Sequence, residues 1–117
     1  MSNNKAEVAA AAERRRGARC RVTVAGMLTF PAASKPIECT IRDLSGTGAR
    51  VALHTNQLVP REMYLINMRD RLAYRADVEW RTSIELGLVF RDTYSLFGLT
   101  DPSLMHLKKL WHARLRA

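Results

Sequence analysis

The sequence contains few cysteines and few aromatic residues for its length. Two of the 117 residues are cysteines, and aromatic residues make up 7% of the chain. Cys20 and Cys39 form no CxxC pair and no spacing typical of a metal site, which argues against a zinc-stabilised fold. Both cysteines fall at apolar positions of strand-like runs. We therefore expect buried, reduced thiols, with a disulfide between them as the alternative.

A long hydrophobic run is also absent. No stretch approaches the roughly 18 apolar residues of a membrane-spanning helix. The apolar run at residues 8–12 is too short for the core of a secretion signal, and the arginines follow it instead of preceding it. We expect a cytoplasmic protein without a membrane partner.

The patterns of common catalytic and metal sites are missing as well. The three histidines, His54, His106 and His112, form no helical i, i+4 pair, and the acidic residues are scattered without an evident dyad. The sequence contains no zinc pattern, no nucleophile elbow and no phosphate-binding loop with a lysine after its glycines. We predict a protein that is not an enzyme, with no catalytic residues, no metal and no cofactor.

Negative charge is scarce relative to positive charge. The chain has 19 lysines and arginines against 11 acidic residues, a formal net charge of +8. Such a balance favours an anionic partner, such as nucleic acid, a nucleotide or a membrane surface. The stretch "ERRRGARC" holds four arginines and no lysine: Arg14, Arg15, Arg16 and Arg19. Because like charges repel each other, this cluster indicates an anionic partner that compensates its positive charge.

From residue 20 onward the hydrophobic residues alternate with period two, which is typical of strands. Turn residues separate six such runs: "RVTV", "IECTIRD", "ARVALH", "MYLINM", "LAYRADVEW" and "IELGLVF". The alternation places Trp80 and Ile84 on the inward sides of their runs. Short strands at this regular spacing predict a small antiparallel barrel or sandwich.

The pattern changes to a helical period near the C-terminus. Asp101 is a candidate N-cap and Pro102 suits the first helical position. An apolar face follows, which predicts one amphipathic helix that closes or covers the barrel; its members are Leu104, Leu107, Leu110, Trp111 and Leu115. We expect a flexible tail over residues 1–12 and a single domain over 13–117. Within it we expect an arginine segment at 13–19, the barrel at 20–91 and the helix at 101–115.

A second motif lies in "RDLSGTGAR", where Asp43, Ser45 and Gly48 form a D-x-S-x-x-G pattern between two strands. Alone it predicts a hairpin turn, because Asp and Ser bond to nearby backbone amides and glycine suits tight turns. Preceded by the R-x-x-x-R of Arg15 and Arg19, it resembles the PilZ-domain family of cyclic di-GMP receptors. The resemblance runs from about residue 13 to residue 90. It includes a tryptophan that ends one strand, Trp80, and a glycine inside the next, Gly87.

The resemblance implies a fold and a set of ligand contacts. The fold is a mostly β, six-stranded antiparallel PilZ-type barrel with a C-terminal α-helix and a flexible N-terminal arm. The residues expected to bind cyclic di-GMP are Arg14, Arg15, Arg19, Asp43, Ser45 and Gly48, with Arg16, Trp80 and Arg81 as further candidates. Chemistry agrees, because guanidinium forks match phosphate oxygens and the O6 and N7 atoms of guanine, and a carboxylate complements the N–H donors of guanine.

The same resemblance implies a mechanism. In the family, an arginine just before the first motif arginine, here Arg14, accompanies an intercalated dimer of the ligand. The arginine segment is then expected to fold over the barrel on binding and to present a new surface to an unidentified downstream protein. The family's outputs include motility, exopolysaccharide synthesis, biofilm formation and virulence in bacteria, and nothing in the sequence chooses among them.

Other interpretations of the same residues stay open. Trp80 is a core residue or a ligand platform, Asp43 and Ser45 are a plain turn or a binding site, and Arg16 contacts ligand or water. Gly87 is expected to ease strand curvature or close packing. The whole chain is alternatively a PilZ-like module that binds protein and no nucleotide. A basic nucleic-acid-binding barrel is the other alternative, although a stacking pair of aromatic residues is missing from the exposed strand faces.

Overall fold

The computed structural model describes residues 19–31 and 35–116. The tail expected at residues 1–12 lies outside the described residues. Three of the expected ligand-binding residues also lie outside them: Arg14, Arg15 and Arg16.

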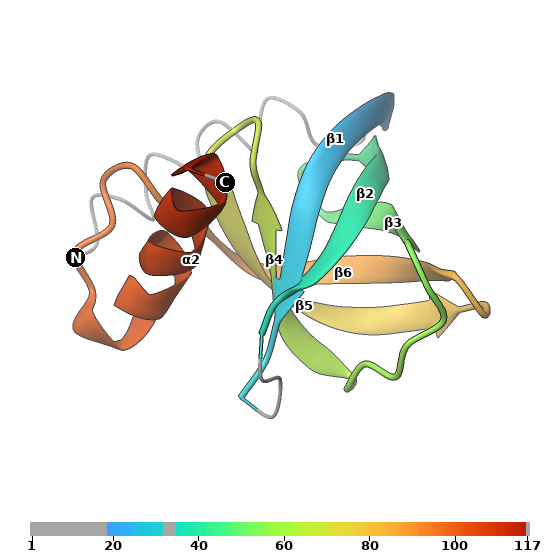
Figure 1. Ribbon diagram of the computed structural model, residues 1–117. Coiled ribbons are helices and arrows are strands. Elements are labelled where there is room, and N and C mark those ends of the chain that lie inside the picture. The colour runs from blue at the N-terminus through green and yellow to red at the C-terminus, as the bar shows by residue number, and fades with distance from the viewer. Residues whose placement is uncertain (1–18, 32–34, 117) are drawn as a thin grey trace.

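Six antiparallel strands form a closed barrel in the order β1-β2-β3-β6-β5-β4 (Figure 1). The strands are β1 (Cys20–Thr29), β2 (Ile37–Leu44), β3 (Gly48–Leu53), β4 (Glu62–Asn67), β5 (Leu72–Arg81) and β6 (Glu85–Ser95). This arrangement confirms the predicted six-stranded antiparallel barrel. Each of the six alternating runs in the sequence lies within or across one of these strands.

The barrel interior is filled by the apolar side chains that alternate along the strands. Ile41, Val51 and Leu86 are completely buried there, and Leu65 and Leu28 close the core from β4 and β1. A stacked pair of rings joins β5 to β6, because Tyr74 and Phe90 have centroids 3.9 Å apart and an interplanar angle of 7°. Burial of these apolar side chains inside the barrel is the main source of its stability.

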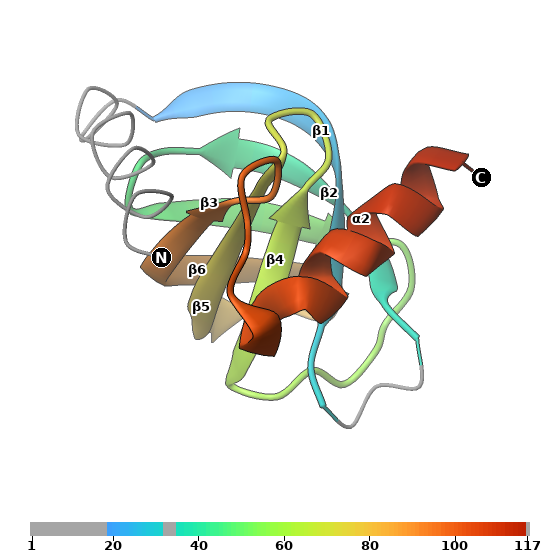
Figure 2. The same ribbon diagram turned by 90° about the vertical axis from the view of Figure 1, so that its left-hand side faces the viewer.

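The C-terminal helix covers one outer side of the barrel. A 3₁₀ turn, η1 (Pro102–Leu104), leads into α2 (Met105–Arg116), and the Asp101 carboxylate accepts a hydrogen bond from the Ser103 backbone N–H. A second apolar cluster joins Leu107 and Trp111 to Met27, Ile66 and Ala73, which point outward from β1, β4 and β5. Figures 1 and 2 show α2 lying against this side of the barrel.

Several side chains expected inside are exposed. Leu115 is 58% exposed because it lies in the last turn of α2, and Ile84 is 50% exposed in the turn that precedes β6. Both cysteines are free thiols, as expected, but Cys20 is exposed at the first position of β1. The inward prediction for Leu115, Ile84 and Cys20 was wrong because each lies at or just beyond an end of its element, where the side chain stays exposed.

Two β-bulges change which face the following residues occupy. On β2, Ile41 pairs with Val51 and Asp43 pairs with Arg50, so Arg42 is the extra residue. On β5, Val78 pairs with Leu88 and Trp80 pairs with Gly87, so the residue between them, Glu79, is extra. A bulge breaks the strict alternation of faces. Asp43 and Trp80 therefore both lie on the outer face, and the inward placement of Trp80 was wrong.

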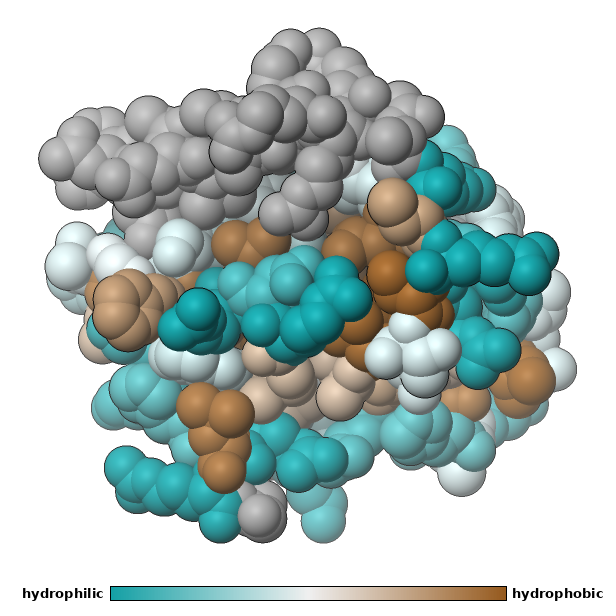
Figure 3. Space-filling model, turned by 90° about the horizontal axis from the view of Figure 1, so that it is seen from above, coloured by the Kyte–Doolittle hydropathy of each residue, from teal (hydrophilic) through white to brown (hydrophobic). Residues whose placement is uncertain are grey.

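The end of the barrel where β1 begins is shown from above in Figure 3. On the described part of this face, hydrophilic side chains surround smaller hydrophobic groups. Among the described residues, no helix is long and apolar enough to cross a membrane.

Candidate ligand-binding site

Five strands contribute to one row of residues on the outer face of the barrel. Consecutive backbone pairings join Arg21 to Asp43, Asp43 to Arg50, Arg50 to Gly87 and Gly87 to Trp80. Neighbouring strands lie about 4.8 Å apart, so Asp43 and Trp80 are separated by roughly 14 Å along this row. The two residues that the bulges turn outward therefore lie on one continuous surface. We call it the outer row, and its members are Arg21, Asp43, Arg50, Gly87 and Trp80.

Asp43 is almost buried and is held by an arginine. The Nε of Arg50 donates to Oδ2 of Asp43 at 2.5 Å, and its Nη1 donates to Oε2 of Glu85 at 2.7 Å. The hydrogen bond from Arg50 to Asp43 is the main reason that the pKa of Arg50 is raised, and Glu85 adds to it. Arg50 thus links β2 to β6 and fixes the orientation of the Asp43 carboxylate.

Ser45 shapes the turn that follows β2. Its hydroxyl oxygen accepts hydrogen bonds from the backbone N–H groups of Thr47 and Gly48, each at 3.2 Å, while the Ser45 N–H donates to the Gly48 carbonyl at 2.9 Å. A side chain at Gly48 would overlap the carbonyl oxygen of Leu88 on β6. Glycine at position 48 is therefore required by close contact with β6, in addition to any role at a ligand.

Trp80 lies on the outer surface with its ring over Gly87. Trp80 is 42% exposed, and a Cβ at Gly87 would overlap the indole. Gly87 thus provides the flat floor for the ring, the close packing that the sequence indicates. An exposed indole on a flat support can stack on a planar ligand ring.

The structure brings together most of the described residues of the expected site. Asp43, Ser45 and Gly48 lie at the β2–β3 turn, and Trp80 lies at the far end of the outer row. Arg19 is exposed immediately before β1, and because Cys20 pairs with Leu44, it lies at the Ser45 end of β2.

Arg81 is directed elsewhere. Its guanidinium donates to the backbone carbonyl of Gln57 at 3.1 Å and to that of Thr82 at 3.3 Å. Arg81 therefore stabilises the loop between β3 and β4, and its guanidinium does not point toward the outer row.

Sequence reasoning missed four charged residues around this surface: Arg21, Arg42, Arg50 and Glu85. Arg50 alternates with the inward-facing Val51, so its outward direction could have been read from the sequence. Glu85 lies 35 residues beyond Arg50, and no local pattern relates the two. Strand register had to be known before this ion pair could be found.

The outer row therefore combines a buried carboxylate, a serine-ordered turn, an exposed indole and several guanidinium groups. Such a set suits a planar, anionic ligand that has hydrogen-bond donors on its ring. In the described part of the chain, no group of three or more His, Cys, Asp or Glu side chains could hold a metal ion.

Comparison with known proteins identifies the family of this chain. No curated protein and no solved structure matches the chain. The PilZ domain family matches residues 13–96, which include the arginine segment, the D-x-S-x-x-G turn and all six strands. Because this match spans most of the chain, and the fold is the one that the motifs predict, the protein belongs to the PilZ-domain family.

Proposed function

We propose that this chain is a receptor for cyclic di-GMP that binds the nucleotide on the outer row, between the D-x-S-x-x-G turn and Trp80. PilZ domains are binding modules of second-messenger signalling and not catalysts. Membership of the family supports a receptor in general. The ligand itself and the mode of binding are our proposal.

The observation that carries the proposal is that the Asp43–Arg50 pair and the exposed Trp80 lie on the same outer row of the barrel. Oδ2 of Asp43 is occupied by Arg50, which holds the carboxylate in place. Oδ1 of Asp43 has no hydrogen-bond partner among the described residues, so it can accept from N1–H or N2–H₂ of a guanine. The indole of Trp80 offers a stacking surface for a base at the other end of the same row.

The arginines would supply the anion recognition. Arg19 is exposed at the end of β2 where Ser45 lies, and Arg14 and Arg15 precede it in the sequence. Guanidinium groups can bind phosphate oxygens bidentately and can also stack on purines. We propose that Arg15 and Arg19 bind phosphate and guanine, and that Arg14 allows an intercalated pair of nucleotides, two per chain.

Binding would also act as a switch. We propose that the arginine segment, residues 13–19, closes over the outer row when the nucleotide binds. That movement would shift several positive charges and create a surface for a downstream protein. Hydrogen exchange tests this step, and protection at residues 13–19 that is the same with and without nucleotide would exclude it.

Calorimetric titration with cyclic di-GMP tests the function. GTP and cyclic GMP serve as ligand controls, and Arg15→Ala as the loss-of-binding variant. We expect saturable binding of two nucleotides per chain that is abolished in the variant and absent for both controls. A folded sample that binds no cyclic di-GMP would instead favour a protein-interaction module without a nucleotide. A stronger response to generic DNA or RNA would favour a nucleic-acid-binding barrel.

A further inference from the structure

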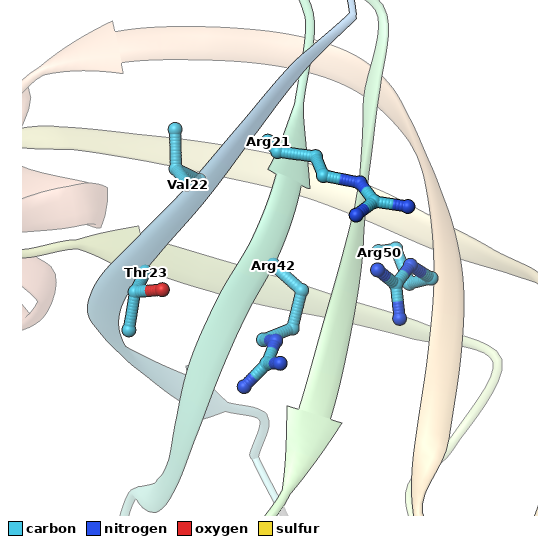
Figure 4. Close-up of a pocket in the computed structure, with 5 residues that line it drawn as sticks. All are labelled: Arg21, Val22, Thr23, Arg42 and Arg50. Atoms are coloured by element: carbon cyan, nitrogen blue, oxygen red, sulfur yellow. The ribbon is translucent and has the colours of Figure 1, made fainter.

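A surface pocket lies next to the outer row. Its volume is about 410 Å³, and it is lined by Arg21, Val22, Thr23, Arg42 and Arg50. Figure 4 shows Arg21 extending from β1 across β2 toward Arg50, with Arg42 projecting from β2 on the same side. Arg21 and Arg42 belong to neither the R-x-x-x-R motif nor the D-x-S-x-x-G turn, so the family motifs assign them no task.

The bulged register of β1 and β2 creates this pocket. Between the pairs Arg21–Asp43 and Val24–Ile41, two residues of β1 face the single residue Arg42. The extra residue in β2 also makes Arg42 and Asp43 consecutive outward-facing positions. A regular strand would have turned one of them into the core. The bulge therefore places two arginines directly beside the carboxylate that we assign to guanine.

The charge in the pocket is only partly compensated. Arg50 is paired with Asp43 and Glu85, whereas neither Arg21 nor Arg42 has a carboxylate partner among the described residues. Three arginines against two carboxylates leave a net positive charge. Two other arginines on the barrel wall each have a carboxylate partner, because Arg75 lies 3.0 Å from Asp92 and Arg91 lies 2.7 Å from Asp77.

We infer that Arg21 and Arg42 form a phosphate subsite, separate from the R-x-x-x-R motif, and that its occupant is a phosphodiester of the second nucleotide copy. Two guanidinium forks that face one pocket suit a phosphate group, because each can donate two parallel hydrogen bonds to its oxygens. Arg50, held by its two carboxylates, forms a fixed wall beside them. That the occupant is cyclic di-GMP rests on the proposed function. That the occupant carries a phosphate group rests on the two arginines alone.

The position of the pocket explains why the second copy is the expected occupant. Arg21 pairs directly with Asp43, and Arg42 precedes it, so a phosphate here lies about one strand spacing from the guanine held by Asp43. The motif arginines would neutralise the phosphates of the first copy. A second copy stacked on the first brings two further negative charges, which Arg21 and Arg42 can meet.

The test compares the wild-type chain with the double variant Arg21→Ala/Arg42→Ala by calorimetric titration with cyclic di-GMP. Arg116→Ala is the matched control, because it removes an exposed arginine from α2 on another side of the barrel. We expect two nucleotides per chain for the wild type and the control. The double variant should bind one, with the affinity of that first site within about twofold. Arg42→Lys should bind the second copy at least fivefold more weakly than the wild type.

A second arm uses inorganic phosphate and pyrophosphate, followed by NMR of the arginine Nε–H signals. Saturable shifts of the Arg21 and Arg42 signals in the wild type, with a shift of the neighbouring Arg50 signal that is lost in the double variant, support a phosphate subsite, even if cyclic di-GMP does not bind. In that case the occupant is a separate phosphorylated molecule, the proposed function fails, and the subsite stands.

Two results would overturn the subsite. One is a double variant that still binds two nucleotides with wild-type affinity while phosphate produces no shift at Arg21 or Arg42. The other is a double variant that remains folded but loses both nucleotides together, because the two arginines would then belong to the first site. Retained folding is verified by the methyl region of the proton spectrum.

Discussion

The indole of Trp80 lies directly on Gly87, the residue that pairs with it across β5 and β6. This contact exists because the bulge at Glu79 turns Trp80 away from the core and because glycine leaves room for the ring. It places an exposed aromatic surface at one end of the outer row, opposite Asp43. The proposed binding site depends on this contact as much as on the charged residues.

Gly87→Ala should displace the indole, because the new Cβ would overlap the ring. We expect a changed Trp80 fluorescence spectrum and cyclic di-GMP binding about tenfold weaker, the magnitude of losing one base–aromatic stack. Trp80→Ala should weaken binding to the same extent. In the Trp80→Ala background, Gly87→Ala should have no further effect, and an additive loss would show that Gly87 acts independently of the ring.

Asp43→Asn should weaken cyclic di-GMP binding by about 10- to 100-fold, because charge-assisted hydrogen bonds to guanine are lost. Titration calorimetry measures the change. Asp92→Asn is the control. Asp92 is also paired with an arginine, Arg75, but it lies near the end of β6, away from Gly87 and the outer row. Equal affinities for Asp43→Asn and the wild type would remove Asp43 from the site.

Gly48→Ala should destabilise the barrel by about 1–3 kcal/mol, because its Cβ would press on the rigid backbone carbonyl of Leu88. Urea unfolding gives the free energy. If stability stays at the wild-type value, the close approach of the β2–β3 turn to β6 is not a constraint, and glycine at position 48 would serve the ligand alone.

Arg71 has a φ of 59°, the left-handed conformation that suits glycine, and its guanidinium lies 5.6 Å from the centroid of the Phe97 ring. Arg71→Gly relieves the backbone and loses the ring contact, whereas Arg71→Ala loses the contact without relief. The glycine variant should therefore be more stable than the alanine variant by about 1 kcal/mol. Thermal unfolding of the two variants side by side tests this, and equal midpoints would contradict it.

Cys39 should be unreactive in the folded protein. Burial, with a smaller effect from Glu38, raises the pKa of its thiol to about 12, so the thiolate is scarce at pH 8. Because the folded-state pKa is raised, this thiol opposes folding only when the pH rises above the ordinary cysteine pKa. A thiol reagent at pH 8 should label only Cys20 in the native chain and both cysteines in urea. Rapid native labelling of Cys39 would show that the barrel opens.

Much of the fold could be predicted from the sequence, and the reason is physical. Each strand buries one face, so alternation located all six, and the Asp101–Pro102 pair marked the start of the C-terminal helical segment. The two motifs also indicated Asp43, Ser45 and Gly48. These signals are local, which is why a single sequence carries them.

The rest of the site depends on register. No sequence pattern predicts the bulges at Arg42 and Glu79, yet these bulges turn Asp43 and Trp80 to the outer face. The link from Arg50 to Glu85 joins strands far apart in the chain, and the pocket at Arg21 and Arg42 needs the offset between β1 and β2. Leu115 was misplaced because periodicity cannot tell where the covered part of a helix ends.

The most direct measurement is an NMR titration of the ¹⁵N-labelled chain with cyclic di-GMP. The chain has two tryptophans, so the indole N–H signals of exposed Trp80 and buried Trp111 report separately on the outer row and on α2. We predict saturable shifts of the Trp80 indole and of the Ser45 and Gly48 amides, with the Trp111 indole unchanged. An unchanged spectrum from folded protein, or shifts confined to α2, would contradict nucleotide binding on the outer row.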